Sequence, residues 1–334
     1  MRMTVLASGS KGNSTVVASS ETRILIDAGL SCRELLKRMA AAGEDPAALT
    51  AILVTHEHQD HVSGLATLAR KLRIPVYFTE PTHRAWVRMV TPRSTMTYAE
   101  WLAKVQEEKA QRAAQIAMEQ SSSSGISSKE SSAPGILSDV TSSIAAVADP
   151  DEDEAEPETA KPEPGYLPSV EYFASGAPFT IGDIAVTPFT IPHDAADPCG
   201  FVFESLSEHV RMAVATDLGY VPPNVKAALR RIDVLLLESN HDLEMLRDGP
   251  YPWSVKQRVL SRVGHLSNHA AAEFLARDYD GGAAYIVLGH LSEHNNVPEL
   301  AQLAAEQALG NRMSLLGNRI LLARQEAPLA PICL

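Results

Sequence analysis

The sequence predicts an α/β fold. Short apolar runs rich in branched side chains, such as 51–54 (Ala-Ile-Leu-Val) and 233–238 (Asp-Val-Leu-Leu-Leu-Glu), are typical of strands covered on both faces. Other stretches, such as 62–72, have apolar residues at helical spacing. The 334 residues can form two domains or one large α/β domain with an insertion. An apolar content of 45% supports a substantial core, and an aromatic content of 5% makes it mostly aliphatic.

The composition argues against a membrane protein and against a disulfide framework. No apolar run approaches the roughly 20 residues that span a bilayer, and the apolar part of the first ten residues is too short for a secretory signal. Cys32, Cys199 and Cys333 are an odd and widely spaced set, which favours a reducing cytoplasm. We interpret Cys199, six residues after His193, as a small core residue rather than a ligand.

The chain begins with a predicted β-hairpin whose strands are 3–7 and 15–18. The turn between them, 8–14 (Ser-Gly-Ser-Lys-Gly-Asn-Ser), lacks the Gly-x-x-x-x-Gly-Lys-Ser/Thr spacing of a phosphate-binding loop. Asp27 ends the next strand, where it is either a partner of a ligand histidine or a turn-forming residue. The other elements predicted before residue 92 are strands at 23–27 and 74–78 and helices at 32–42, 62–72 and 81–90.

The main cluster of metal-ligating residue types is Thr55-His56-Glu57-His58-Gln59-Asp60-His61, directly after the run 51–54. Because side chains alternate past a strand end, His56 and His58 become neighbours and one ion can take both ring nitrogens. Asp60 and His61 follow as the chain turns into a helix, and they can serve a second ion. Neutral imidazole and carboxylate suit Zn²⁺, Mn²⁺ or Fe. The spacing therefore predicts a metal-binding loop at the end of a buried strand.

The composition changes at residues 93–167. This stretch comprises a possible exposed helix (98–120), a serine-rich run (121–143) and an acidic run with proline (149–163). Such a segment cannot bury enough apolar surface to offset its ordering entropy. We predict a largely disordered insertion in a single domain formed by 1–92 and 168–334. We interpret it as a tolerated surface insertion; the alternative is a regulatory segment that mimics a phosphate backbone or binds a partner.

The net charge of −12 argues at first against a protein that handles nucleic acid, because phosphate backbones favour basic surfaces. Residues 93–168 carry about 14 acidic and 6 basic side chains, so about −8 of the −12 lies in that stretch. The rest of the chain is only mildly acidic.

The strand pattern resumes after residue 168 and places two further candidates at strand ends. His193 follows one strand and Asp217 another. The strands predicted here are 171–173, 179–181, 184–189, 200–204 and 210–215.

The C-terminal third carries the remaining candidate residues. His241 follows the buried strand 233–238 and either touches substrate or supports a ligand. Arg258 and Arg262 share a helical face and can contact phosphates, the alternative being an ordinary solvated face. The predicted elements are helices at 222–231, 254–262 and 269–278 and a last core strand at 283–289, followed by His290.

Gly264-His265-Leu266-Ser267-Asn268 precedes the predicted helix 269–278. Ser267 or Asn268 is a suitable N-cap, which leaves free amides and a positive helix end where a phosphate can bind. Both are candidate substrate contacts.

The cluster at 55–61 resembles the His-x-His-x-Asp-His signature of the metallo-β-lactamase-fold superfamily. The resemblance implies an αββα sandwich, with two mixed β-sheets packed face to face, helices outside and a dinuclear metal site. It covers 1–92 and about 168–325. Six further stretches make the chain similar to the YycJ/WalJ exonuclease branch, which is related to ribonuclease Z and PhnP-type phosphodiesterases: 27–31, 191–195, 216–219, 238–242, 264–268 and 289–292.

The resemblance also implies roles for individual residues. It places His56, His58 and His193 on one metal, Asp60, His61 and His290 on the other, and Asp217 between the two. A carboxylate has two oxygens and can bridge; the alternative for Asp217 is a simple turn. His265 matches the histidine that donates a proton to the leaving oxygen in ribonuclease Z-like enzymes, and Asp60 is the second catalytic candidate. Asn13 is expected near the site, while His83, His209, His269 and His294 match no ligand position.

The activity implied by the resemblance is 5′-to-3′ exonuclease action on double-stranded DNA, with two divalent metals and a link between cell-wall control and replication. The first alternative is a small-molecule phosphodiesterase of the cyclic nucleotide type. The second, hydrolysis of thioesters, lactones or β-lactams, is disfavoured by the His265/His290 pair and by the lack of a cysteine ligand. A non-enzymatic metal-stabilised module is disfavoured by the full ligand set. No membrane partner is expected, and the oligomeric state stays open.

Overall fold

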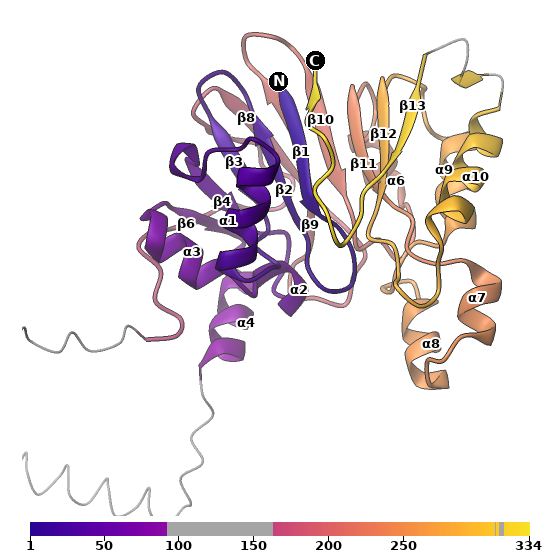
Figure 1. Ribbon diagram of the computed structural model, residues 1–334, viewed down its shortest axis with the longest axis horizontal. Helices are drawn as coiled ribbons and strands as arrows, with labels where there is room; N and C mark the ends of the chain where they lie inside the picture. The colour runs from indigo at the N-terminus through magenta and orange to yellow at the C-terminus, as the bar shows by residue number, and fades with distance from the viewer. Residues whose placement is uncertain (92–162, 311, 314–316) are drawn as a thin grey trace, which may run out of the picture. The chain divides into compact units, whose positions relative to one another are not determined.

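Two seven-stranded mixed β-sheets form the centre of the structure (Figure 1). The computed structural model describes residues 1–91, 163–310, 312–313 and 317–334. Met1–Thr91 and Glu163–Leu334 form one unit. The helix expected at 98–120 and the serine-rich and acidic runs lie outside the described residues. Leu167, which the sequence assigned to the insertion, is only 8% exposed and packs in an apolar layer of this unit.

The first sheet is built mainly from the N-terminal part of the chain. β1 pairs antiparallel with β2, which confirms the predicted hairpin, and β2 pairs antiparallel with β3. From β3 to β6 each neighbouring pair is parallel. The strand order is β14 (Ile332–Cys333), β1 (Arg2–Ala7), β2 (Ser14–Ala18), β3 (Arg23–Ile26), β4 (Ala51–Leu53), β5 (Val76–Phe78) and β6 (Val170–Tyr172).

The second sheet has the same design. From β7 to β10 neighbouring strands are antiparallel, and from β10 to β13 they are parallel. The strand order is β13 (Arg319–Leu322), β12 (Tyr285–Gly289), β11 (Val234–Glu238), β10 (Arg211–Ala215), β9 (Cys199–Ser205), β8 (Ile184–Thr190) and β7 (Phe179–Ile181).

Three apolar layers hold the sheets and helices together. Alternate residues of a strand face opposite layers: Met212 and Val214 of β10 lie between the sheets, whereas Ala213 and Ala215 lie under the outer helices. The helices cover the outer faces of both sheets (Figure 1). This confirms the expected αββα sandwich. The helices are α1 (Cys32–Ala41), η1 (Pro46–Ala48), α2 (Gln59–Val62), α3 (Leu65–Leu72), α4 (Glu80–Val90), α6 (Pro223–Ala228), α7 (Leu243–Asp248), α8 (Trp253–Val259), α9 (Asn268–Arg277) and α10 (Pro298–Leu309).

The prediction of one helix over 62–72 was wrong, because the chain breaks at Gly64 between α2 and α3. The Gly64 amide donates to the Ala28 carbonyl at 2.8 Å, and a Cβ at Gly64 would lie 2.2 Å from the Leu30 carbonyl oxygen. The close approach of these two chain segments therefore needs a glycine.

Several elements near the C-terminus also differ from the prediction. Strand 283–289 is not the last core strand, because β13 pairs parallel with β12 at the sheet edge. α7 and α10 were not predicted, although α10 places apolar residues at helical spacing. The helices α6 and α8 end earlier than expected. In α8 this leaves a turn in which the His265 amide donates to the Val259 carbonyl at 3.0 Å.

No helix in the described part of the chain is long and apolar enough to cross a membrane. All three cysteines are free. Cys199 is fully buried in the layer between the sheets, which confirms its interpretation as a core residue.

Candidate metal centre and active site

The candidate site is assembled from residues that follow strand ends. Because β3 runs parallel to β4, and β10 runs parallel to β11 and β12, the carboxyl ends of these strands lie at a common end of each sheet. α2, which carries Asp60 and His61, lies at the lower end of the sheets, away from both termini (Figure 1). The strand ends deliver Asp27 after β3, His56 and His58 after β4, His193 after β8, Asp217 after β10 and His290 after β12.

The first candidate ligand group consists of His56, His58 and His193, the three residues that the family resemblance assigns to one metal. Their ligand atoms all lie within 4.8 Å of one another. His193 Nε2 is 3.2 Å from His58 Nδ1, so two ring nitrogens of different loops face the same point. Burial, followed by the charges of the neighbouring imidazoles, lowers the pKa of His56 well below its ordinary value. A neutral imidazole is the form that binds a metal.

The second ligand group consists of Asp60, His61 and His290. Asp60 Oδ2 lies 3.5 Å from His61 Nε2 and 3.6 Å from His290 Nε2. Asp217 lies between the two groups, because its Oδ2 is 3.5 Å from His61 Nε2 and its Oδ1 is 3.9 Å from His193 Nε2. The arrangement thus brings together all seven residues proposed as ligands, with Asp217 close to members of both groups.

The side chains fit a divalent cation. Within the described residues, three buried atoms of the site have no hydrogen-bond partner: His56 Nε2, His290 Nε2 and Asp217 Oδ2. Buried polar atoms are rarely left unpaired in native proteins. Carboxylate oxygens and imidazole nitrogens are ordinary ligands of Zn²⁺, Mn²⁺ and Fe, and each of these three atoms belongs to a residue of the candidate ligand groups.

The charges of the site also favour a cation. Burial by itself lowers the pKa of His61 and His290, but the negative charge of Asp217 and the adjacent Asp60 raise both pKa values well above the ordinary value. Burial alone raises the pKa of Asp60, but the charge of His61 and the nearby ring of His290 hold it well below its usual range. A space that stabilises protons on two buried imidazoles can accept a divalent cation in their place.

The ligand histidines are oriented by partners on their other ring nitrogen. His61 Nδ1 lies 2.7 Å from Asp27 Oδ2, His56 Nδ1 lies 3.0 Å from Thr55 Oγ1, and His193 Nδ1 lies 3.2 Å from the Gly264 carbonyl. Of the two roles left open for Asp27, the structure therefore supports that of partner to a ligand histidine.

Asp27, Asp217 and His290 all adopt left-handed backbone conformations, with φ of 59°, 62° and 56°. This region is uncommon for residues other than glycine and is concentrated at functional sites. Each residue directly follows, or lies near, the end of a strand, where the change of backbone direction aims its side chain into the site.

Glu238, the last residue of β11, is fully buried and joins two histidines of the site. Its Oε1 accepts hydrogen bonds from His265 Nδ1 at 2.9 Å and His290 Nδ1 at 2.8 Å. Its Oε2 accepts from the backbone amides of Leu218 and Leu266. Sequence reasoning assigned no role to Glu238; the signal that could have found it is an acidic residue that ends an otherwise apolar strand.

His265 lies at the rim of the site, with its side chain 20% exposed. With Asp217, Glu238 and His290 it forms a further group of ligand-type atoms within 4.8 Å. Both histidine Nδ1 atoms are hydrogen bonded to Glu238, so we interpret this group as a hydrogen-bond cluster beside the metal centre. His265 uses Nδ1 for its hydrogen bond to Glu238, and Nε2 takes no part in that bond.

His241, Ser267 and Asn268 are buried, and their contact with substrate stays a prediction. His241 is 1% exposed, and burial lowers its pKa to about 4, so it is a neutral buried ring. Ser267 Oγ caps α9 by accepting from the Ala270 amide at 3.1 Å. The Asn268 side chain is hydrogen bonded to Ser239 and Asn296. The Ser267 and Asn268 side chains thus support the fold around the site, whereas both ring nitrogens of His241 have no hydrogen-bond partner in the described structure.

Arg258 remains available to a substrate. It is 59% exposed and pairs with Asp194, the residue after the ligand His193. That hydrogen bond, with the charges of Asp194 and Asp60, raises the pKa of Arg258 despite the opposing effect of partial burial. Arg258 therefore places a positive charge beside the metal centre.

Gly29 is required by the close packing of the metal loop. A Cβ at this position would lie 1.7 Å from the Asp60 carbonyl oxygen and 2.6 Å from the Asn13 amide nitrogen. These two atoms are joined by a 2.7 Å hydrogen bond. We expect Gly29→Ala to separate them and to lower the free energy of unfolding by about 1–3 kcal/mol or more. Denaturant unfolding of the metal-free protein measures this change. The control is Gly43→Ala: a Cβ at Gly43 would meet nothing within 4 Å, but φ there is 74°. Gly43→Ala therefore reports the cost of backbone strain without the cost of a packing clash.

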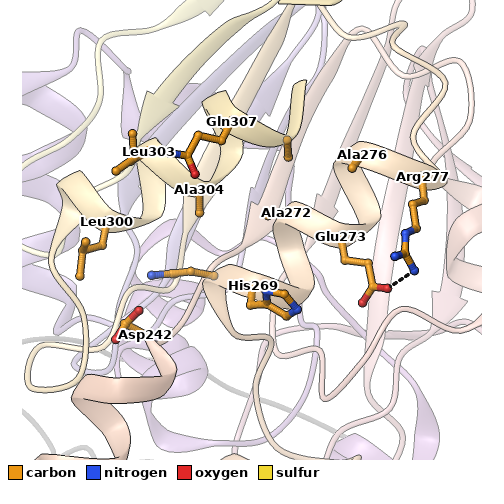
Figure 2. Close-up of a pocket in the computed structure, with 12 residues that line it drawn as sticks. Asp242, His269, Ala272, Glu273, Ala276, Arg277, Leu300, Leu303, Ala304 and Gln307 are labelled. Carbon is orange, nitrogen blue, oxygen red and sulfur yellow. Dashed lines mark hydrogen bonds and ion pairs between the residues drawn. The ribbon is translucent and has the colours of Figure 1, made fainter. Parts of the chain in front are cut away.

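A separate groove of about 520 Å³ lies between α9 and α10. Its lining contains none of the seven ligand residues. Figure 2 shows Leu300 and Leu303 on one wall and the ion-paired Glu273 and Arg277 on the other, with His269 near the base. His269 thus faces a different part of the surface from the metal centre.

Comparisons with known proteins agree with this fold and site. Residues 7–99 match the family described as Metallo-beta-lactamase superfamily, and residues 137–290 match the Beta-lactamase superfamily domain. The chain is 32% identical over 311 residues to the exodeoxyribonuclease YycJ of Bacillus anthracis, covering 92% of this chain and 89% of that protein. It is also 32% identical over 302 residues to the exodeoxyribonuclease WalJ of Streptococcus pneumoniae, covering 90% of this chain and 86% of that protein.

Among solved structures, human tRNase Z, short form, is similar with a TM-score of 0.52 over 99% of both chains. At 14% sequence identity this likeness shows the fold alone. The sequence identity to YycJ and WalJ is higher and extends over nearly the whole chain, so it shows the family to which the chain belongs. The chain therefore belongs to the metallo-β-lactamase superfamily, in the family of the exodeoxyribonucleases YycJ and WalJ.

Proposed function

We propose that this protein is a metal-dependent exodeoxyribonuclease that hydrolyses double-stranded DNA from the 5′ end. The observation that carries the proposal is the pair of ligand groups joined at Asp217, with the Glu238–His265 pair at their edge. The 32% identity to two exodeoxyribonucleases supports the choice of DNA among the substrates of this superfamily.

We propose that the site holds two divalent cations, with Zn²⁺, Mn²⁺ and Fe as candidates. His56, His58 and His193 would hold one, Asp60, His61 and His290 the other, and Asp217 would contact both. When bound, the cations supply activation of the attacking water and neutralisation of charge on the phosphodiester. The protein side chains fix the positions at which the positive charge of the cations would be available.

His265 is the proposed general acid. Its Nδ1 donates to the buried carboxylate of Glu238, which fixes the ring orientation and leaves Nε2 for the substrate. A proton held on Nε2 can be donated to the oxygen that leaves phosphorus. Arg258, on the other side of His193, is the proposed contact for a substrate phosphate.

The cellular setting is also a proposal. Three free cysteines are consistent with a reducing cytoplasm, and the proposed DNA substrate is consistent with the same compartment. The role of residues 93–167 as a surface insertion stays a prediction.

A time course on duplex DNA labelled at either end, with and without a 5′ phosphate, tests the function. With Mn²⁺ or Zn²⁺ we expect wild-type protein to release nucleotides from the 5′ end, and Asp60→Ala to release none because the second ligand group loses its carboxylate. Bis-p-nitrophenyl phosphate is assayed in parallel. Hydrolysis of this diester without loss of nucleotides from DNA would identify a small-molecule phosphodiesterase instead.

A further inference from the structure

Two exposed ion pairs lie on chain segments that adjoin the two ligand groups. Lys11 Nζ lies 2.8 Å from the Glu293 carboxylate, and these side chains are 67% and 48% exposed. Arg258 pairs with Asp194 on the side of the first ligand group. In both pairs the acid is close in sequence to a ligand: Asp194 follows His193, and Glu293 is three residues after His290. Each ligand group therefore has an ion-paired cation bound to a neighbouring segment of the chain.

The backbone at Lys11 is fixed although its side chain is exposed. The Lys11 amide donates to Gln325 Oε1 at 2.7 Å, and Gln325 Nε2 donates to the Gly12 carbonyl at 3.0 Å. Two residues later, Asn13 Nδ2 lies 3.2 Å from Asp60 Oδ2 and 3.1 Å from His61 Nε2. The turn that carries Lys11 is thus held against the second ligand group.

We propose that Lys11 is a phosphate-binding residue of this site and that, together with Arg258, it selects a polynucleotide over a small diester. This rests on the proposed function and deepens it. Exposed ion pairs contribute little in water, so a phosphate can replace Glu293 as the partner of Lys11. A single small diester occupies the ligand groups only. A nucleic acid strand carries further phosphates, which reach cations on both sides of the centre.

The test compares Lys11→Ala with Lys37→Ala. Lys37 is a matched control, because it is also exposed (76%) and paired with an acid, Glu34 at 3.5 Å, on helix α1. At low salt we expect Lys11→Ala to raise KM for duplex DNA about 5- to 10-fold, with a smaller change in kcat and a smaller change in KM for bis-p-nitrophenyl phosphate. Lys37→Ala should retain the wild-type KM.

The salt dependence gives an independent measure. Loss of one phosphate contact lowers the slope of log affinity against log salt by about 0.9, so the effect of Lys11→Ala should shrink about 3.5-fold between 50 and 200 mM salt. Glu293→Gln should lower KM for DNA, and this gain should be smaller in the Lys11→Ala background because the two residues interact. If Glu293→Gln acted only through the net charge of the protein, it would lower KM by the same factor in the wild-type and Lys11→Ala backgrounds.

The outcomes separate this inference from the proposed function. If wild type degrades duplex DNA and Lys11→Ala has the same KM and salt slope as Lys37→Ala, the role of Lys11 is overturned and the nuclease function stands. If wild type hydrolyses only the small diester, the proposed function fails and the role of Lys11 fails with it.

Discussion

Asp217→Asn is expected to bind fewer than two metal equivalents and to reduce turnover on DNA at least about 10³-fold. Among the described residues, Asp217 is the carboxylate that lies within 4.8 Å of ligand atoms of both His56, in the first group, and His61, in the second. An amide keeps the shape of the side chain but loses its charge and one acceptor oxygen. A metal contributes several kcal/mol of charge stabilisation, and each 1.36 kcal/mol is a factor of ten in rate.

Asparagine is chosen because it tolerates the left-handed backbone conformation that Asp217 adopts (φ 62°), so the fold should persist. Metal content after gel filtration and the single-turnover rate are measured together, with circular dichroism to check the fold. Asp248→Asn, which changes an exposed carboxylate of an ion pair with Arg247, is the control. Retention of two metal equivalents and wild-type turnover by Asp217→Asn would remove Asp217 from the bridging position.

The local part of the site could be predicted from the sequence because its residues lie close together in the chain. His56, His58, Asp60 and His61 lie within a span of six residues that follows β4, and alternation past the strand end is enough to pair the first two. His193, Asp217 and His290 are distant in sequence, and only the resemblance to a family assigned them. The structure supplies the physical reason: parallel strands end at the same side of their sheet.

Other features depended on contacts that no local pattern contains. Glu238 has a role only because Leu218, His265, Leu266 and His290 converge on its two oxygens. Ser267 and Asn268 were expected to bind substrate because a helix N-terminus attracts anions. Their side chains are hydrogen bonded to Ala270, Ser239 and Asn296, contacts that the sequence did not indicate, and their contact with substrate stays a prediction. Sequence periodicity also continued across Gly64, where contact with Leu30 ends the helix.

His265→Ala is expected to retain both metal equivalents and to lose about 10²- to 10⁴-fold in turnover, the usual contribution of a general acid. The ring lies beside the ligand groups and is anchored by Glu238, which also holds His290. Removal of His265 leaves the Glu238–His290 bond in place, so metal binding should persist. Metal analysis and single-turnover rates measure the two properties separately.

The neighbouring His269→Ala is the matched control, because His269 is an exposed histidine on α9 that lines the separate groove (Figure 2). It should keep wild-type turnover. His265 is 20% exposed, so the space left by the alanine is open to solvent, and added imidazole should restore part of the rate. A purely structural role would give no such rescue. Loss of a metal equivalent in His265→Ala would instead place His265 among the ligands, since its Nδ1 lies 3.9 Å from Asp217 Oδ1.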